Sequence, residues 1–284
     1  MPVFFRTTGT VGGPEFFLRR SSRGLRAVRM PVTIAVIERP EGLTLIDAGW
    51  SRRTCAWPDE EIGTVARMGL GLHVKPEDAI ASQLISLGYA PGDVRHVIAT
   101  HLHRDHVGGV ADLPSATVHF AEREWSAAKE APAWRGFDLA SLSGRELRHH
   151  ELDGPPELGF SSSKDVFGDG TVLLLDARGH TRGSTAVAVK LDEGWMIHSG
   201  DAAMFAEDYR MGDEVAPSLY MRAMSWDIAH QRATWHHLRD AEAQHAARVV
   251  PSHDPARFDE VPHTREEGWV TAWDKKKGKK KKPS

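Results

Sequence analysis

The chain has 284 residues, of which 40% are hydrophobic and 26% are charged. That is the composition of an ordinary globular protein, and the length suits one large domain. No run approaches the roughly 18 apolar residues that a membrane-spanning helix needs. The opening residues, MPVFFRTTGTVGGPEFF, also lack the continuous apolar core of a signal peptide. We therefore expect a soluble, cytoplasmic protein with no membrane partner.

The cysteine content limits which bonds and metal sites the chain can form, and the charge distribution sets the tail apart from the rest. Cys55 is the only cysteine, so an intrachain disulfide and a thiolate metal cage are both excluded. The net charge is −3, but residues 275–284 contain seven lysines, so the rest of the chain carries −10. We expect a single domain over 1–274 and a disordered lysine-rich tail over 275–284, because like charges repel. A nucleic-acid partner is not expected.

Short β-type runs and helical patterns alternate along the chain. Strands are predicted over 32–38, 43–47, 94–100, 171–176, 185–190, 195–198 and 248–251, and helices over 76–87 and 225–247. This mixture predicts an α/β fold built from layers of sheet and helix. Residues 49–73, 132–170 and 202–224 show no clear period, and long loops of this kind often carry function.

The segment 99–109, ATHLHRDHVGG, contains the densest group of metal-binding residue types. His101 and His103 lie two residues apart at the end of a predicted strand, so both imidazoles point the same way. Asp105 and His106 follow where the chain turns, and two glycines allow a tight bend. Imidazole nitrogen and carboxylate oxygen together suit zinc, iron or manganese.

This segment resembles the H-x-H-x-D-H signature of the metallo-β-lactamase superfamily. The other motifs of that family follow in order: LIDAG at 45–49, GHTRGS at 179–184, SGD at 199–201 and PSH at 251–253. The resemblance covers roughly residues 30 to 255. It implies an αββα sandwich, in which two mixed β-sheets are flanked by helices.

The resemblance also implies a pair of divalent metal ions. One ion would be bound by His101, His103 and His180, the other by Asp105, His106 and His253, with Asp201 bridging them and Asp47 orienting a ligand. Zinc is the expected metal, although a site of nitrogen and oxygen ligands also accepts manganese, iron or cobalt.

Such a metal pair implies hydrolysis. Two neighbouring cations would bridge a water and lower its pKa from ~15.7 towards ~7, which supplies hydroxide at neutral pH. Asp105 and Asp201 are the expected catalytic residues, with Asp105 carrying a proton from the attacking water to the departing alkoxide. We therefore expect a metal-dependent hydrolase that opens a lactone or cleaves a small ester.

Within the superfamily, the pattern is closest to the N-acyl-homoserine lactonases. Many β-lactamases of the family place a cysteine ligand near the position of Asp201, whereas Cys55 lies far upstream. Glyoxalase II adds a helical domain at its C-terminus, but only about thirty residues follow His253. The β-CASP nucleases need an inserted domain for which this chain has no room.

One position departs from the lactonase pattern. Many lactonases place a tyrosine three residues after the bridging aspartate, and here that residue is Met204, followed by Phe205. An apolar residue there resembles phosphotriesterases of the methyl parathion hydrolase type. Tyr209 or Tyr220 could replace the missing hydroxyl. We predict that Met204, Phe205 and Tyr220 contact the substrate.

Three alternatives to a lactonase remain open. The first is the phosphotriesterase, and the second is a mononuclear iron dioxygenase of the persulfide type, which shares much of the first motif. The third is a metal-stabilised scaffold without catalytic activity. A homodimer, the commonest assembly of soluble proteins, is possible.

Overall fold

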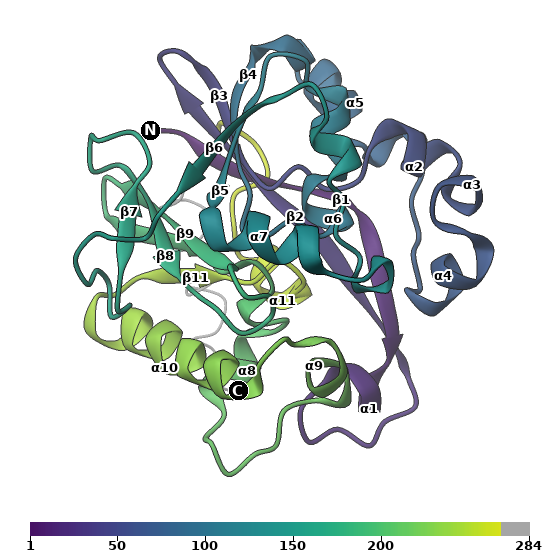
Figure 1. Cartoon of the computed structure of the whole chain (residues 1–284), viewed down its shortest axis with the longest axis vertical. Helices are drawn as coiled ribbons and strands as arrows, with labels where there is room; N and C mark the ends of the chain where they lie inside the picture. Colours follow the sequence, from purple (N-terminus) through teal and green to yellow (C-terminus); the bar gives the residue numbers. More distant parts are fainter. Residues whose placement is uncertain (268–284) are drawn as a thin grey trace, which may run out of the picture.

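Two β-sheets packed face to face form the centre of the molecule (Figure 1). The structure is a computed structural model that describes residues 1–267, so the predicted tail over 275–284 lies outside the described residues. The first sheet contains, in spatial order, β1 (Val3–Pro14), β2 (Ala27–Arg39), β3 (Gly42–Ile46), β4 (Val94–Ile98), β5 (Thr117–Ala121) and β6 (Glu146–His150). The second contains β11 (Arg248–Val250), β10 (Gly194–His198), β9 (Thr185–Leu191), β8 (Val172–Asp176) and β7 (Ser163–Asp165).

Both sheets are mixed. In the first, β1, β2 and β3 pair antiparallel, whereas β3 to β6 pair parallel. In the second, only β10 and β11 pair parallel. Parallel neighbours end at the same edge of a sheet, so the segments that follow β3, β4, β10 and β11 can meet.

Strand β2 shows why the sheets pack as they do. Its side chains alternate: Ala35 and Ile37 pack between the sheets against Val187 of β9, while Ile34 and Val36 pack on the opposite face. Each of these five side chains is fully buried. Covering both faces of a sheet requires a continuous apolar strand, which explains the run PVTIAVI.

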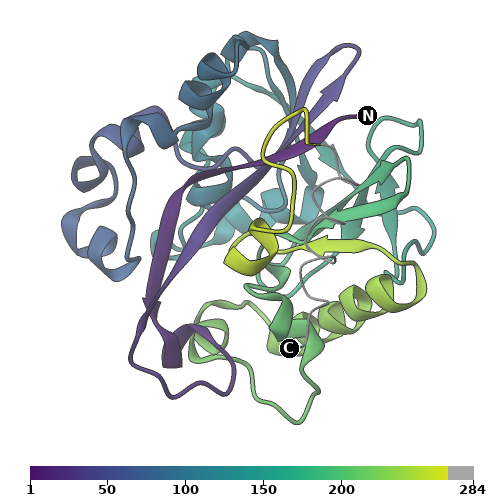
Figure 2. The same cartoon turned by 180° about the vertical axis from the view of Figure 1, so that it is seen from behind.

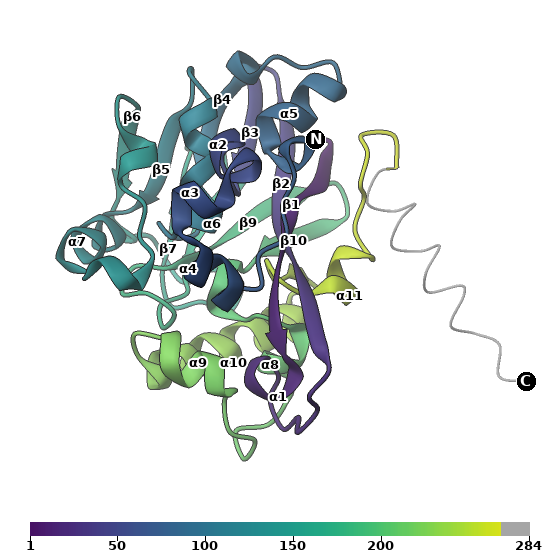
Figure 3. The same ribbon diagram turned by 90° about the vertical axis from the view of Figure 1, so that its right-hand side faces the viewer.

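Helices cover the outer faces of both sheets (Figures 1 and 3). Helix α5 (Ile80–Ser86) packs on the first sheet, and α10 (Ile228–Gln244) packs on the second. The other helices are α1 (Glu15–Leu18), α2 (Arg52–Ala56), α3 (Pro58–Ile62), α4 (Thr64–Gly69), α6 (Arg104–Val107), α7 (Glu122–Glu130), α8 (Ala206–Arg210), α9 (Leu219–Met224) and α11 (Pro255–Phe258). The predicted αββα sandwich is confirmed.

A long hairpin extends the first sheet on one side. Strands β1 and β2 run past the rest of the sheet to α1, which lies beside α9 (Figures 2 and 3). In this way the N-terminal segment reaches a helix that follows it by some two hundred residues. The contact closes one side of the cavity described below.

All seven predicted strands are present, but the prediction missed β1, β5, β6 and β7. The pattern of β1 is broken by a register shift between Thr7 and Thr10, where Gly9 has a φ of 99°. The helix predicted over 76–87 begins as a 3-10 turn at Pro76–Asp78 and continues as α5. Within residues 1–267, none of the helices is long and apolar enough to cross a membrane.

The three stretches without a clear period are not plain loops. Residues 49–73 contain α2, α3 and α4, residues 132–170 contain β6 and β7, and residues 202–224 contain α8 and α9. These elements have at most six residues, which is too few for a sequence period to show.

Candidate metal centre

The seven predicted ligands come together at one end of the sandwich. His101 and His103 follow β4, and Asp105 and His106 lie on the short helix α6. The remaining three lie in the turn between β8 and β9, directly after β10 and directly after β11: His180, Asp201 and His253. Of the seven side chains, only that of Asp105 is substantially exposed, at 22%.

Three histidines form the first group of donors. Nδ1 of His103 lies 3.0 Å from Nε2 of His101 and 3.1 Å from Nε2 of His180. Zinc–nitrogen bonds of 2.0–2.1 Å in a tetrahedral site place two ligand atoms about 3.3 Å apart. The three imidazoles therefore have the spacing of a cation site.

Asp105, His106 and His253 form the second group, beside Asp201. Nε2 of His106 and Nε2 of His253 each lie 3.6 Å from Oδ2 of Asp105 and 3.2 Å from Oδ1 of Asp201. The other oxygen of Asp201 lies 3.5 Å from Nε2 of His180. Asp201 thus turns one carboxylate oxygen towards each group, as a bridging ligand would.

The polar atoms of this centre suit a pair of cations. Nε2 of His106 and Oδ1 of Asp201 are buried and, among residues 1–267, have no partner in hydrogen-bonding geometry. Buried polar atoms without partners are costly and rare in folded proteins. A metal ion at this position would give both atoms a partner, so the residues present fit the implied metal pair.

Electrostatics divide the histidines into two kinds. Burial lowers the pKa of His101, His103 and His180, which favours the neutral imidazole that binds metal. Burial acts in the same direction on His106 and His253, but the negative charge of Asp201 outweighs it and raises the pKa of both.

Asp201 responds in the opposite sense. Burial would raise the pKa of its carboxyl, but the charges of His253 and His106 lower that pKa well below its usual value. A cation bound between these groups would replace the imidazole protons, so metal binding at the second group should release protons.

Polar groups behind the ligands fix the orientation of the imidazoles. Asp47 accepts hydrogen bonds from the backbone N–H of Thr100 at 2.8 Å and contacts Nδ1 of His106 at 2.7 Å. The backbone carbonyl of Pro31 lies 2.8 Å from Nδ1 of His253. In both rings the Nδ1 contact leaves Nε2 directed at the centre, as expected for metal ligands.

The structure also explains the glycines of the first motif. Neither Gly108 nor Gly109 has a positive φ, so the predicted tight bend is not the reason for them. A Cβ at Gly109 would instead overlap the carbonyl oxygen of Ala48. This close approach brings the motif against the segment that carries Asp47.

A cavity of about 520 Å³ opens over the second group of ligands, with Asp105, Asp201 and His253 in its wall. The rest of the wall is largely apolar and comes from the N-terminal hairpin, α3, α4, the segment 133–137 and α9. It includes Val11, Phe17, Leu18, Met30, Trp50, Ile62, Leu70, Trp134, Phe137, Met204, Tyr220 and Met224.

A second cavity of about 260 Å³ lies beside the first and is lined by Glu130 and Arg182 among others. Both cavities share His103, Arg135, Phe137 and Met224 in their walls. Arg135 donates a hydrogen bond of 2.8 Å to the backbone carbonyl of Met224. Its side chain therefore links segment 133–137 to the end of α9 where the cavities meet.

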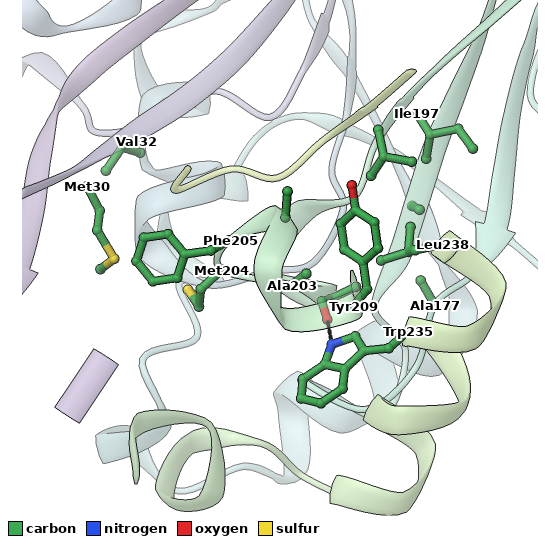
Figure 4. Packing of buried hydrophobic residues seen from close by; sticks show 14 of the residues in the cluster. Met30, Val32, Ala177, Ile197, Ala203, Met204, Phe205, Tyr209, Trp235 and Leu238 are labelled. Carbon is green, nitrogen blue, oxygen red and sulfur yellow. Dashed lines mark hydrogen bonds between the residues drawn. The ribbon is translucent and has the colours of Figure 1, made fainter. Parts of the chain in front are cut away.

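The residues predicted to contact substrate differ in position. Met204 and Tyr220 lie in the wall of the larger cavity. Phe205 lies in the core, near Met30 in Figure 4, with the guanidinium of Arg19 over its ring. Tyr209 is also buried, and its hydroxyl donates to Glu242 at 2.8 Å. Of the two tyrosines considered as replacements, Tyr220 is the one beside the ligands.

The sequence marked 132–170 only as a long loop that could carry function, and it singled out neither segment 133–137 nor Thr100 nor Pro31. The aromatic and basic composition of 134–137, WRGF, was the one available signal for a binding wall. His198 directly precedes the motif SGD at 199–201 but is not part of it. Its ring accepts from the N–H of Gly200 at 3.3 Å and stacks on Phe5. Cys55 is buried, and burial raises the pKa of its thiol to about 12, as expected for an inert thiol.

Comparison with known proteins agrees with this geometry. A probable metallo-hydrolase of Mycobacterium tuberculosis is 34% identical over 232 residues, which are 78% of this chain and 71% of that protein. An N-acyl homoserine lactonase of Agrobacterium fabrum is 27% identical over 239 residues, 82% of this chain and 86% of the lactonase.

The fold is also shared with a solved structure. An N-acyl homoserine lactone hydrolase, with the product N-hexanoyl-L-homoserine bound at its catalytic metal centre, superimposes with a TM-score of 0.71 at 20% identity. The match covers 90% of this chain and 94% of that one. The family model of the metallo-β-lactamase superfamily matches residues 27–253. The chain therefore belongs to the metallo-β-lactamase superfamily, as a metal-dependent hydrolase.

Proposed function

We propose that this protein opens lactones or cleaves small carboxylic esters that carry an apolar acyl group, using two divalent metal ions, zinc being the best fit. The observation that carries the proposal is the larger cavity. Its wall combines a ligand edge of Asp105, Asp201 and His253 with a mainly apolar lining. An ester carbonyl at the ligands would leave its acyl chain against that lining.

The metal pair supplies the reactivity when bound, because it acidifies water and polarises an ester carbonyl. The chain's own residues do the rest. Asp105 is partly exposed at the cavity, so its carboxylate can pass a proton to the departing alkoxide. The apolar wall excludes water from the acyl chain.

Tyr220 is the proposed hydrogen-bond donor to the substrate. Burial raises the pKa of its hydroxyl, and the charges of Asp201 and Asp105 raise it further, so the hydroxyl keeps its proton at working pH. A protonated hydroxyl in the cavity wall can donate to the carbonyl oxygen as that oxygen gains negative charge. In this role Tyr220 replaces the tyrosine that many lactonases carry at the position of Met204.

Hydrolysis rates on a substrate panel test the proposal. N-acyl homoserine lactones of increasing chain length, simple lactones, aryl esters and an aryl phosphotriester would be compared on zinc-loaded protein. We expect lactones or esters to be preferred, and kcat/KM to rise about fourfold for each methylene that enters the cavity, since burying one contributes ~0.8 kcal/mol. No hydrolysis of any lactone or ester by protein with two bound ions would contradict the proposal.

A phosphotriesterase is the alternative, and Met204 is the observation that favours it. Its side chain is apolar, lines the cavity and is 1% exposed, at the position where many lactonases carry a hydroxyl. A higher kcat/KM for the phosphotriester than for every lactone and ester would establish this alternative.

A further inference from the structure

Glu124 connects the two loops that carry the three-histidine group. It lies in the first turn of α7, and none of its surface is exposed. Its Oε1 accepts from the backbone N–H of Leu102 at 2.9 Å, between His101 and His103. Its Oε2 accepts from the hydroxyl of Thr181 at 2.6 Å, next to His180. The same oxygen accepts from the N–H of Gly183 at 3.1 Å.

These contacts are not those of an ordinary helix residue. The three donors lie outside α7, in segments separated by about eighty residues of sequence. Burying a carboxylate costs several kcal/mol unless its oxygens are hydrogen-bonded. A buried glutamate with both oxygens hydrogen-bonded to distant segments therefore indicates a structural role for these contacts. A leucine or alanine would fill this position on a helix at lower cost.

The loop after His180 is fitted closely to this residue. A Cβ at Gly183 would overlap the backbone nitrogen of Glu124, so only glycine allows the loop to approach α7 this far. At that distance the N–H of Gly183 reaches the carboxylate. The GHTRGS motif therefore contributes a ligand, His180, and two of the three donors to Glu124.

The second group of ligands is held by different partners. Asp47 contacts His106, and the carbonyl of Pro31 contacts His253. Among the described residues, the Glu124 carboxylate hydrogen-bonds at Leu102, Thr181 and Gly183, and not to α6, which carries His106, or to the segment of His253. Glu124 thus supports the three-histidine group directly, whereas Asp47 contacts His106 and, through Thr100, also reaches His101.

We propose that Glu124 is a positioning residue that sets the spacing of His101, His103 and His180, and so determines metal affinity at that half of the centre alone. This inference rests on the metal pair of the proposed function, but not on the identity of the substrate. Loss of the carboxylate would let the two loops separate, while His106 and His253 keep their contacts to Asp47 and Pro31.

The test compares Glu124→Gln with Glu122→Gln. Both changes replace a carboxyl group by an amide at the same end of α7, but the Glu122 side chain is 44% exposed and pairs with His149 on the surface. Gln keeps the size of Glu, yet its amide nitrogen must face one of the N–H donors. Zinc affinity would be measured by competition with a chelator, and zinc positions by anomalous X-ray scattering from crystals.

We expect Glu124→Gln to weaken one of the two zinc equivalents by about 10- to 100-fold, the range found when groups behind metal ligands are removed. The zinc peak at the three histidines should fall while the peak at His106 and His253 stays. Glu122→Gln should bind both ions as the unmodified protein does. Two equivalents of unchanged affinity in Glu124→Gln, or an equal loss at both, would overturn the proposal.

Variants of Thr181 provide a second test that does not depend on whether Glu124→Gln folds. Thr181→Val removes one donor to the carboxylate and keeps the shape of the side chain, whereas Thr181→Ser keeps the hydroxyl. We expect the valine variant to show a smaller loss confined to the same zinc ion and the serine variant to restore it. Equal zinc binding in the two variants would also overturn the proposal. If the unmodified protein binds two ions but hydrolyses nothing, the proposed function fails and this inference stands.

Discussion

Nδ1 of His106 lies 2.7 Å from Oδ2 of Asp47, and both side chains are 1% exposed. Asp47 has a φ of 58°, in the left-handed region that few residues other than glycine, asparagine and aspartate adopt. The same carboxylate accepts from the N–H and hydroxyl of Thr100, which precedes the first ligand. A strained backbone position is thus retained where one side chain contacts the ligand-bearing segment 99–109 at two points, Thr100 and His106.

Asp47→Asn should weaken zinc binding at the second group of ligands by about 10- to 100-fold. Asparagine tolerates the left-handed backbone, so the change removes the charge and one acceptor without forcing the chain to move. Competition with a chelator would measure the affinity. A variant that binds both zinc ions as tightly as the unmodified protein would show that the Asp47–His106 contact does not support the site.

Asp201→Asn should abolish tight binding of the metal pair and lower kcat/KM by roughly three orders of magnitude, since the ions supply several kcal/mol of transition-state stabilisation. The amide cannot present a negative oxygen to each group, and its N–H₂ would face an imidazole or a cation. Metal content after gel filtration and the rate on the best substrate would be measured together. Full activity with fewer than two ions per chain would contradict a bridging role.

The clustering of the seven predicted ligands could be foreseen because each motif is short and follows a strand. Four of the seven lie within six residues of sequence: His101, His103, Asp105 and His106. This short spacing alone brings their side chains close together. Asp47 could be predicted from its own motif. The strands that carry these residues could be predicted as well, because buried parallel strands are continuous apolar runs.

The supports could not be predicted, for physical reasons. The carbonyl of Pro31 contacts His253, which lies 222 residues away in sequence. Every residue type has a backbone carbonyl, so the residue at this position gives no sign of the contact. Glu124 looks like any acidic residue in the first turn of a helix, which favours negative charge there. Its burial depends on two distant loops that meet only in the folded chain.

Tyr220→Phe should lower kcat/KM about 5- to 30-fold without changing metal content. The hydroxyl would contribute one hydrogen bond, and such a bond is worth roughly 1–2 kcal/mol. Tyr209→Phe is the matched control, because that hydroxyl donates to Glu242 on α10 instead. We expect the control to affect stability and leave kcat/KM unchanged. Equal rates for Tyr220→Phe and the unmodified protein would remove Tyr220 from the site.

A row of three histidines crosses the first sheet away from the metal ligands. Nε2 of His119 lies 3.0 Å from Nδ1 of His96, and its Nδ1 lies 3.0 Å from Nε2 of His150. These residues belong to the neighbouring strands β4, β5 and β6. Burial lowers the pKa of His119 to about 3, and it lowers the pKa of the other two as well. All three rings are therefore neutral in the folded protein at neutral pH.

Acidification should destabilise the protein through His119, because the unfolded chain takes up a proton near pH 6.5 and the folded chain only near pH 3. Between these values each such proton lowers the free energy of unfolding by up to about 1.4 kcal/mol per pH unit. His119→Phe removes this contribution, so its free energy of unfolding should fall less steeply from pH 7 to pH 4.5 than that of the unmodified chain. Urea unfolding of both proteins in a chelator would compare the slopes without a contribution from metal release. His101 and His103 are present in both proteins, so their contribution to the pH dependence cancels in the comparison. Equal slopes of the free energy of unfolding against pH would therefore mean that burial does not hold His119 neutral.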